Sequence, residues 1–330
     1  MKREKLYCGI DISNETIDVC IEQPDGSFTS ETLSNSGLGY RKLRQLTKKY
    51  TYHYVMEYTG VYHMSLSLYL EKKGCLYSIL NPLQVKRYIQ MQLERSKTDK
   101  KDAKHICCYG IERNPEVYQM PEQAYFECRS LNNSIETLTQ KITSFTNKIH
   151  SLQKQNLSKK TVLKSYERIV KMLKKELKYL ETELNAQLKD WHPELVELVS
   201  SVTGIGKRAT AHLIIGTQGF KYTESYQQLI SFAGLSPREY SSGTSVRGRV
   251  RIYKIGKSKL RNTLYMCALG AMSTNPFCKQ LYERLVEKGK NKKVAIIAVC
   301  NKLLKLVFGV VQSNTKFDKN YLMPTADAAF

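Results

Sequence analysis

The chain has 330 residues, of which 42% are apolar, and it carries 52 Lys and Arg against 30 Asp and Glu, a net charge of +22. This length predicts two or three domains, and the basic excess points to a polyanion: nucleic acid first, because neutralised phosphates release counterions, with an anionic membrane surface as the competitor. No run approaches the ~18 apolar residues of a membrane span and no signal-peptide stretch opens the chain, so we expect a cytoplasmic, nucleoid-associated bacterial protein with no membrane partner.

Nine cysteines are scattered along the chain without a Cys-x-x-Cys pair. This spacing argues against a zinc site and against a disulfide framework. We therefore interpret the cysteines as small buried apolar residues, with a nucleophilic cysteine as the less favoured alternative.

Residues 1–120 alternate between strand and helix signals. The predicted elements are three short strands within 5–34, a helix at 38–49, a strand at 52–56, a helix at 61–73, a strand at 75–80 and helices to about residue 113. A meander of strands followed by alternating helices and strands predicts an α/β domain with a mixed sheet.

Residues 121–194 carry a pattern that is typical of long helices. Seven apolar residues follow one another at spacings of four and three: Leu131, Ile135, Leu138, Ile142, Phe145, Ile149 and Leu152. After a polar stretch comes a second apolar series: Ile169, Leu173, Leu177, Leu180, Leu184 and Leu188. The pattern predicts a helical hairpin or coiled-coil spacer, and an intrachain helix pair and a dimerising coiled coil fit it equally well.

The C-terminal part is predicted to be a compact, mainly helical domain at 195–315, followed by a tail at 316–330. It holds two glycine-bearing motifs, which are considered below with the charged residues around them. The expected fold class of the whole chain is thus α/β plus all-α.

Four carboxylates lie at the ends or beginnings of predicted elements. Asp11 and Glu57 each end an apolar strand, where side chains that are distant in sequence can converge. Asp99 and Asp102 share one helix face through their i,i+3 spacing. Oxygen donors without His or Cys suit Mg²⁺ or Mn²⁺ better than zinc, and two such ions roughly 3.5–4 Å apart activate an attacking oxygen and stabilise a leaving one.

Each of these residues alone has an ordinary explanation. Asp11 fits a turn after a strand, and Glu57 fits a surface charge. Asp99 and Asp102 fit favourable acids in the first turn of a helix that Thr98 caps. The combination favours a metal site, because the acids lie on a basic chain beside four lysines: Lys97, Lys100, Lys101 and Lys104.

The segments around the carboxylates resemble the three acidic motifs of the DEDD transposases, the insertion-sequence family that includes the pilin-inversion recombinase. The matching segments are Gly9–Asp11, Met56–Gly60 and Lys97–Ala103, and the resemblance covers nearly the whole chain. It implies that residues 1–120 form a ribonuclease-H-like domain related to the RuvC junction resolvase. It also implies that the four carboxylates are catalytic and bind Mg²⁺, for which Mn²⁺ substitutes.

Val202–Ala211 contains a Gly-x-Gly turn that leads into a helix and resembles a helix-hairpin-helix element. Two glycines let backbone N–H groups approach a phosphate, and Lys207 and Arg208 add positive charge at the helix N-terminus. The motif predicts a contact with nucleic acid, but a tight turn between packed helices explains it equally well.

A basic stretch between 238 and 261 is the stronger candidate for contacts with nucleic acid. Against one acid, Glu239, it holds eight basic residues: Arg238, Arg247, Arg249, Arg251, Lys254, Lys257, Lys259 and Arg261. The alternation at 247, 249 and 251 predicts three guanidinium groups on one face of an extended segment, where they can bind phosphate bidentately. The near absence of opposing charge argues against a merely solvated surface.

The family resemblance extends to a Ser-Gly pair at Ser242 and to the motif Gly256–Arg261. It implies that Ser242 is the nucleophile of a second transposase domain. A serine hydroxyl needs a base or a metal to activate it, and no histidine lies nearby in the sequence, so activation would come from the metal site, in the same or another subunit. On chemistry alone, Ser241, Tyr240 and Tyr253 are alternatives.

We therefore expect a site-specific DNA recombinase or transposase of a mobile element, which cuts a strand, forms a 5′-phosphoserine link and passes the strand to a new partner. The resemblance further implies that a structured noncoding bridge RNA selects donor and target DNA, and that homodimers pair into tetramers. Two rival functions are a RuvC-like junction endonuclease that hydrolyses DNA with water, and a non-enzymatic basic nucleic-acid-binding protein. The presence of all four acids argues against the second rival.

Overall fold

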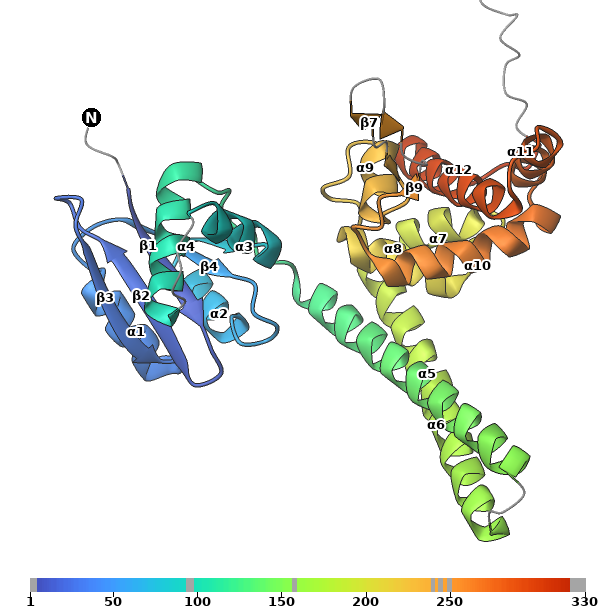
Figure 1. Cartoon of the computed structure of the whole chain (residues 1–330), viewed down its shortest axis with the longest axis horizontal. Helices are drawn as coiled ribbons and strands as arrows, with labels where there is room; N and C mark the ends of the chain where they lie inside the picture. Colours follow the sequence, from blue (N-terminus) through green and yellow to red (C-terminus); the bar gives the residue numbers. More distant parts are fainter. Residues whose placement is uncertain are drawn as a thin grey trace, which may run out of the picture. The chain divides into compact units, whose positions relative to one another are not determined.

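The computed structural model describes residues 5–92, 98–155, 159–238, 241–242, 246–247 and 251–320. The chain divides into two compact units, residues 1–120 and residues 121–330 (Figure 1). Each unit buries its own hydrophobic core.

Unit 1 is built on a five-stranded mixed sheet with the strand order β3-β2-β1-β4-β5. Its strands are β1 (Leu6–Ile12), β2 (Thr16–Glu22), β3 (Phe28–Ser34), β4 (Tyr52–Glu57) and β5 (Leu76–Leu80). The first three strands form an antiparallel meander, whereas β4 is parallel to both β1 and β5. The predicted α/β region with a mixed sheet is confirmed, and β1 lies at the centre of the sheet.

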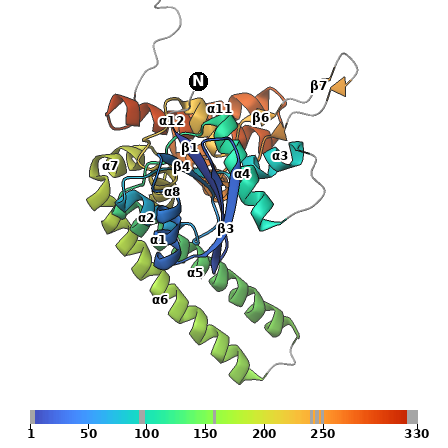
Figure 2. The same ribbon diagram turned by 90° about the vertical axis from the view of Figure 1, so that its left-hand side faces the viewer.

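Helices cover both faces of this sheet (Figure 2). They are α1 (Gly37–Leu46), α2 (Met64–Lys72), α3 (Pro82–Met91) and α4 (Asp99–Arg113). Successive side chains of a strand point to opposite faces. Ile10 of β1 therefore packs with residues of α1 and α2, such as Leu43 and Leu66. Tyr7 packs on the other face with residues of α3 and α4, such as Ile106.

Gly9 lets α4 lie directly on β1. A Cβ atom at this position would lie 2.3 Å from both the carbonyl oxygen of Ala103 and the backbone nitrogen of Cys107. No side chain fits such a gap, so the helix backbone reaches the strand only because residue 9 is glycine. This contact positions the start of α4, which carries Asp99 and Asp102.

Unit 2 begins with two long helices, α5 (Gln123–Gln155) and α6 (Lys160–Trp191), which pack along one another (Figure 1). All seven apolar residues of the predicted seam on α5 are buried or half-buried, while most residues between them are exposed. The six apolar residues of the second series are buried or half-buried on α6. The seam is therefore covered within one chain, as a helical hairpin.

The rest of unit 2 is a cluster of helices. They are α7 (Pro193–Ser201), α8 (Lys207–Thr217), α9 (Tyr226–Phe232), α10 (Ser258–Thr274), α11 (Pro276–Glu287) and α12 (Lys292–Ser313). Helix α12 packs against α7, α9, α10 and α11, and its residues Val299, Leu303 and Val307 are fully buried. The mainly helical character predicted for the C-terminal part is confirmed.

Two short antiparallel strand pairs lie between α9 and α10. One joins β6 (Pro237–Arg238) to β9 (Arg251–Ile252), and the other joins β7 (Ser241–Ser242) to β8 (Val246–Arg247). The second pair is nested within the first, in the manner of a β-hairpin. We call strands β6 to β9 the arginine ribbon; the sequence predicted one extended segment here, but not its pairing.

Helix α12 corrects the expectation that no segment is long and apolar enough to span a membrane. It has 22 residues, and an 18-residue window within it reaches a mean hydropathy of 2.1, so it meets the requirement by length and composition. Eight of its residues are buried in unit 2, and Lys302 and Lys305 interrupt its apolar surface. A helix enclosed by other helices is apolar around much of its circumference, which explains why composition alone is ambiguous here.

Candidate metal centre and nucleic-acid interface

Asp11 and Glu57 lie at the same edge and on the same face of the sheet. The parallel strands β1 and β4 pair Ile10 with Met56, so the two acids are the next residues of neighbouring strands. Ile10 and Met56 both pack on the side of α1 and α2. Side-chain alternation therefore directs both carboxylates to the opposite face, which α3 and α4 cover.

Asp99 and Asp102 lie in the first turn of α4. Thr98 is the N-cap residue, as predicted, and its hydroxyl oxygen accepts a hydrogen bond from the backbone N–H of Lys101 at 3.4 Å. Asp102 is half-buried and lies one turn before the buried Ile106, whereas Asp99 is exposed. A first-turn position is also favourable for acids through the helix dipole, so position alone does not assign them a function.

The packing of α4 on β1 brings these acids toward Asp11. A Cβ atom on Gly110 would meet the ring of Tyr7, and one on Gly9 would meet the backbone of Ala103. The strand and the helix therefore run in opposite directions. Asp11 lies two residues after Gly9 on β1. Asp99 and Asp102 lie in the turn of α4 that precedes Ala103, so they are on the same side of this contact as Asp11.

The charges around Asp11 reflect this arrangement. Burial raises the pKa of its carboxyl above the ordinary value, and the carboxylates of Asp102 and Asp99 raise it further. A hydrogen bond with the backbone of Ile12 lowers it, and Asp18 adds a smaller upward effect. Like charges have this effect only when they are close. Acids from β1 and α4 are thus crowded at one end of the sheet.

Asp18 is a carboxylate of this site that the sequence analysis missed. It is the cross-strand partner of Asp11 in the antiparallel pair of β1 and β2, and it is buried. Its carboxylate accepts a hydrogen bond from the hydroxyl of Thr32 at 2.6 Å. Counting outward from the short turn between the two strands would have placed Asp18 opposite Asp11, because register in a hairpin follows from loop length.

The carboxylates share an edge without converging on one point. Within the described parts of the chain, no three His, Cys, Asp or Glu side chains are arranged closely enough to hold a metal ion. Like charges on neighbouring strands repel, which favours separated side chains. The arrangement is therefore a set of oxygen donors gathered on one face of the sheet.

The Gly-x-Gly turn before α8 is held by α10. Gly204 has a φ of +104°, and a Cβ atom on it would lie 2.6 Å from the Cβ of Ala271. Close helix packing therefore accounts for this glycine. Gly206 is exposed and is the N-cap residue of α8, which opens with Lys207 and Arg208.

Lys207 and Arg208 lie where α8 meets the helical hairpin. With residues of α5 and α6, including Glu181, they line a pocket of about 150 Å³. Arg208 donates a hydrogen bond to the hydroxyl of Thr139 at 2.7 Å. Both side chains are exposed at the N-terminus of a helix, a position that favours anions.

The arginine ribbon places like charges opposite one another. Arg238 of β6 is the cross-strand partner of Arg251 of β9, and both side chains are exposed. On the inner pair, Ser241 is opposite Arg247. Like charges at opposed positions are unfavourable unless a counter-charge lies between them.

The predicted nucleophile and the predicted arginine series both fall within the ribbon segment. Ser242 lies in β7 and is the cross-strand partner of Val246 in β8. Arg249 lies outside the described residues. Of the three arginines predicted to alternate, the structure therefore places two, Arg247 in β8 and Arg251 in β9.

Arg261 supports the base of the ribbon. Its Nη1 donates hydrogen bonds to the carbonyl oxygens of Ala233 at 3.0 Å and Lys254 at 3.4 Å. These contacts tie α10 to the segments that enter and leave the ribbon. Lys254 and Lys257 are exposed beside them, and the Lys257 ammonium lies 5.9 Å from the centre of the Phe232 ring.

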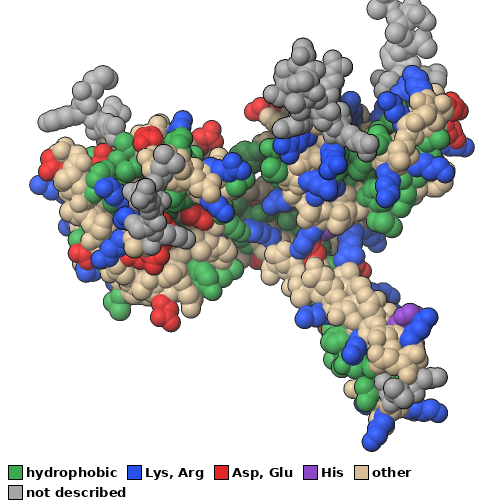
Figure 3. All heavy atoms as spheres, in the orientation of Figure 1, with side chains coloured by type: hydrophobic (Ala, Val, Ile, Leu, Met, Phe, Trp, Pro, Cys, Tyr) green, Lys and Arg blue, Asp and Glu red, His purple; other side chains and the backbone are tan. Residues whose placement is uncertain are grey.

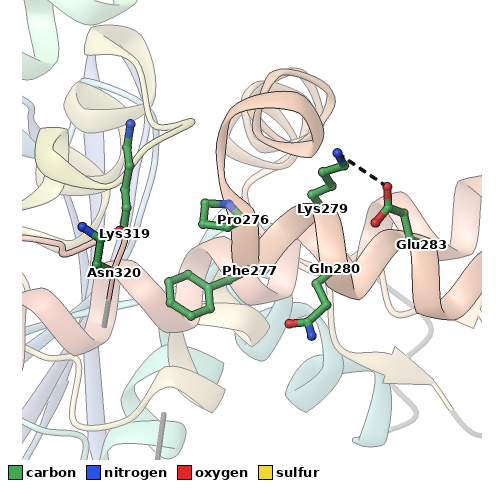
Figure 4. Close-up of a pocket in the computed structure, with 7 residues that line it drawn as sticks. All are labelled: Pro276, Phe277, Lys279, Gln280, Glu283, Lys319 and Asn320. Atoms are coloured by element: carbon green, nitrogen blue, oxygen red, sulfur yellow. Dashed lines mark ion pairs between the residues drawn. The ribbon is translucent and has the colours of Figure 1, made fainter. Parts of the chain in front are cut away.

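A recess on unit 2 offers no comparable chemistry. It has a volume of about 680 Å³ and is lined by residues of α11 together with Lys319 and Asn320 (Figure 4). One of the residues that line the recess is acidic, Glu283, and its Oε1 lies 3.9 Å from the Nζ of Lys279. A single exposed ion pair supplies neither a set of metal ligands nor an activated nucleophile, so the carboxylates and the ribbon are the stronger candidates.

Two family matches cover these same regions. Residues 8–157 match the DEDD transposases of the IS110 type, and this segment contains the four predicted carboxylates. Residues 196–283 match the transposase family named for IS116, IS110 and IS902, and this segment contains the Gly-x-Gly turn and the arginine ribbon. Dependence on a divalent metal ion is a general property that the DEDD family implies.

Similar proteins agree with the family matches. The chain is 29% identical over 331 aligned positions to the pilin gene-inverting proteins of Moraxella bovis and Moraxella lacunata, covering 96% of this chain and 98% of each relative. It is 27% identical over 138 positions to an uncharacterized 43.6 kDa protein of insertion element IS110 from Streptomyces coelicolor, covering 42% of this chain and 33% of that protein. The chain therefore belongs to the IS110 family and is a transposase or recombinase that acts on DNA.

Proposed function

We propose that unit 1 is a ribonuclease-H-like, RuvC-like catalytic domain that binds Mg²⁺, or Mn²⁺ in its place. The proposed ligands are Asp11, Glu57, Asp99 and Asp102. The observation that carries the proposal is the gathering of acids from β1, β4 and α4 on one face at one edge of the sheet. The strand order β3-β2-β1-β4-β5, with an antiparallel meander on one side of β1 and parallel strands on the other, supports it.

The donor set fits a hard divalent cation. Every proposed ligand offers carboxylate oxygen, the donor that Mg²⁺ and Mn²⁺ prefer. A cation at this edge would offset the like-charge repulsion that raises the pKa of Asp11. When bound, the ions supply the polarisation of the attacking and leaving oxygens.

Ser242 is the proposed nucleophile for strand exchange. Its Oγ forms a bond to the phosphorus of a phosphodiester as the bond from phosphorus to the 3′ oxygen breaks, and the serine proton passes to that leaving oxygen. The products are a 5′-phosphoserine and a free 3′-hydroxyl, so one phosphate ester replaces another and the strand can be rejoined without an energy source. Its position on the arginine ribbon and within the second family match supports this role.

The arginine ribbon and the start of α8 are the proposed contacts with the nucleic-acid backbone. Arg238 and Arg251 are cross-strand partners with exposed side chains, so both guanidinium groups can bind the same stretch of phosphate backbone. Lys207 and Arg208 add charge at a helix N-terminus. Further contacts are assigned to Arg247, Arg249, Lys254 and Lys257, while Arg261 holds the ribbon's base.

The proposed partners are donor and target DNA and a structured guide RNA. The relatives named as pilin gene-inverting proteins support exchange between defined DNA sites. In this account the chain has a catalytic domain at 1–120, a hairpin spacer at 121–194, a second transposase domain at 195–315 and a tail. Homodimers that pair into tetramers on the nucleoid would carry out the exchange.

Cleavage assays with metal-site variants test this proposal. Asp11→Asn and Glu57→Gln, each with Ser242 intact, should lower the rate of cleavage of the element's own DNA by at least about 1,000-fold, because metal ions contribute several kcal/mol to such transition states. DNA binding measured in chelator should be unchanged. Lys100→Gln, beside the acids, is the matched control and should cleave. Normal cleavage by both acid variants would contradict the metal site.

The alternative function is a RuvC-like endonuclease that uses water. The carboxylates alone are enough for hydrolysis, so both functions lose activity with Asp11→Asn. They differ in their response to Ser242→Ala, which abolishes strand exchange and leaves hydrolysis intact. The products of this one variant therefore separate the two functions.

A further inference from the structure

The far part of the α5–α6 hairpin holds a disproportionate share of the positive charge. Residues 137–178 contain eleven Lys and Arg against two Glu, a net charge of +9 out of +22 in 42 of 330 residues. Figure 3 shows Lys and Arg side chains along this arm of unit 2. None of these residues belongs to the contacts proposed above for the ribbon and α8.

Most of this charge lies on one face of α6. Seven basic residues follow one another at spacings of one, three or four: Lys160, Lys164, Arg168, Lys171, Lys174, Lys175 and Lys178. All seven side chains are exposed. At 100° per residue they form a band on the side of α6 away from the seam residues Leu173, Leu177 and Leu180, which face α5. We call this band the α6 basic stripe; it is about 27 Å long at 1.5 Å per residue.

The stripe is not neutralised within the chain. Among the described residues none of its seven members has an ion pair. Several members of the stripe are like charges at i,i+4 from one another, such as Lys160 with Lys164 and Lys171 with Lys175, and such pairs destabilise a helix slightly. Elsewhere the chain uses the opposite arrangement, as in the i,i+4 pair of Lys279 and Glu283 on α11. One acid, Glu167, lies on the same face at i,i+4 from Lys171, so the stripe keeps an excess of six positive charges.

The composition of the stripe favours the backbone of a duplex. Six of its seven members are lysines, which act as point charges rather than as bidentate readers of base edges. One exposed aromatic side chain, Tyr179, borders the stripe, whereas proteins that bind single strands usually stack successive bases on a series of aromatic rings. A straight line of about 27 Å can follow several phosphates, since duplex DNA carries one per strand every 3.4 Å or so.

We infer that the α6 basic stripe binds the phosphate backbone of duplex DNA without regard to sequence. It would be a second DNA contact, separate from the arginine ribbon, and it would hold DNA against the hairpin before or during strand exchange. The inference rests on the DNA-acting family of the chain and needs neither the metal site nor Ser242. DNA is chosen over RNA and over anionic membrane because it is the substrate of the family.

Salt-dependent binding by the full chain tests the inference. The stripe variant carries Lys164→Gln, Lys171→Gln, Lys175→Gln and Lys178→Gln. The matched control loses the same charge at exposed lysines of unit 1: Lys48→Gln, Lys49→Gln, Lys72→Gln and Lys73→Gln. The probes are a 30-base-pair DNA duplex of random sequence, an RNA duplex of equal length and vesicles containing phosphatidylserine, all measured in chelator so that no cleavage intervenes.

The stripe variant should lose about 0.9 from the log–log salt slope on DNA for each lysine that contacts phosphate, so roughly 2–4 in total, and the control should lose less than about 1. The thermal midpoint of the stripe variant should be equal to or above that of the wild type, because repulsion between neighbouring lysines on α6 is removed. Equal slopes for the two variants would overturn the inference. So would a loss of binding confined to the RNA duplex or to the vesicles. Because no step of cleavage is measured, failure here is distinct from failure of the proposed function.

Discussion

The acidic edge of unit 1 and the arginine ribbon of unit 2 are built in opposite ways. The acids extend from the central strands of a buried sheet and from a helix that lies directly against it. The ribbon consists of two-residue strands, and the side chains of Arg238 and Arg251 on its outer pair are exposed. Metal chemistry requires carboxylates to be placed accurately by rigid elements, whereas long basic side chains reach a phosphate from many backbone positions. The comparison predicts that small packing changes damage the first region far more than the second.

The largest effect of packing is expected at Gly9. Gly9→Ala would insert a methyl group 2.3 Å from the backbone of α4, so the helix must move away from β1. We expect a loss of about 1–3 kcal/mol in the free energy of unfolding, together with reduced cleavage because Asp102 moves with the helix. Urea denaturation and cleavage assays measure the two effects. Gly37→Ala, where the nearest atom is 3.7 Å away, is the control and should alter neither.

Asp18 should tune the metal site without being essential to it. Asp18→Asn keeps an oxygen that can accept the hydrogen bond from Thr32 but removes one negative charge beside Asp11. We expect the Mg²⁺ concentration for half-maximal cleavage to rise by roughly 10–100-fold, with near-normal cleavage at saturating metal. Thr32→Val should have a smaller effect in the same direction. If Asp18→Asn stays inactive at any metal concentration, Asp18 is itself a ligand and the proposed set is incomplete.

Substitutions in the ribbon should have milder and more uniform effects. Arg238→Gln and Arg251→Gln should each lower the salt slope for DNA binding by about 0.9 and leave the thermal midpoint unchanged, because both side chains are exposed. Arg261→Gln should instead lower the thermal midpoint, since its guanidinium binds the carbonyl oxygens of Ala233 and Lys254. If Arg261→Gln lowered the salt slope and the other two variants did not, the DNA contact would lie at the base of the ribbon, at Arg261, and not at Arg238 and Arg251.

The smallest effect concerns the pH dependence of stability. The folded-state pKa of Asp11 is raised, so the folded protein holds this proton more tightly than the unfolded chain does. Its contribution therefore favours folding at low pH and is lost as pH rises from about 3.9 through the raised value. In chelator, Asp11→Asn should be more stable than the wild type at pH 7, with the difference vanishing below about pH 4. Thermal melts across this range measure it, and added Mg²⁺ should reverse the order at pH 7.

The acidic edge was largely predictable from the sequence, because its signals are local. Apolar strands that end in Asp11 and Glu57, and a capped helix that begins at Asp99, can each be recognised within a few residues. Asp18 was missed because its relevance depends on strand register, which places it opposite Asp11. The convergence of α4 on β1 depends on the close contacts of Gly9 and Gly110, which join segments about a hundred residues apart in the sequence.

The ribbon and α12 were harder to predict, because tertiary context decides them. Paired strands of two residues leave almost no periodic signal, so only an extended basic segment was expected. The hydrogen bonds of Arg261 to carbonyl oxygens are indistinguishable in sequence from a phosphate contact. The apolar length of α12 likewise reflects its enclosure by neighbouring helices, which composition alone cannot reveal.

The most direct test of the central claim is to identify the residue that becomes attached to DNA. Wild-type protein is incubated with the element's DNA and Mg²⁺, the covalent adduct is digested with protease, and tandem mass spectrometry locates the nucleotide. We predict a nucleotide on Ser242, no adduct and no recombinant product with Ser242→Ala, and retained activity with Ser241→Ala. A nucleotide on Tyr240 or Tyr253, or recombination by Ser242→Ala, would contradict it.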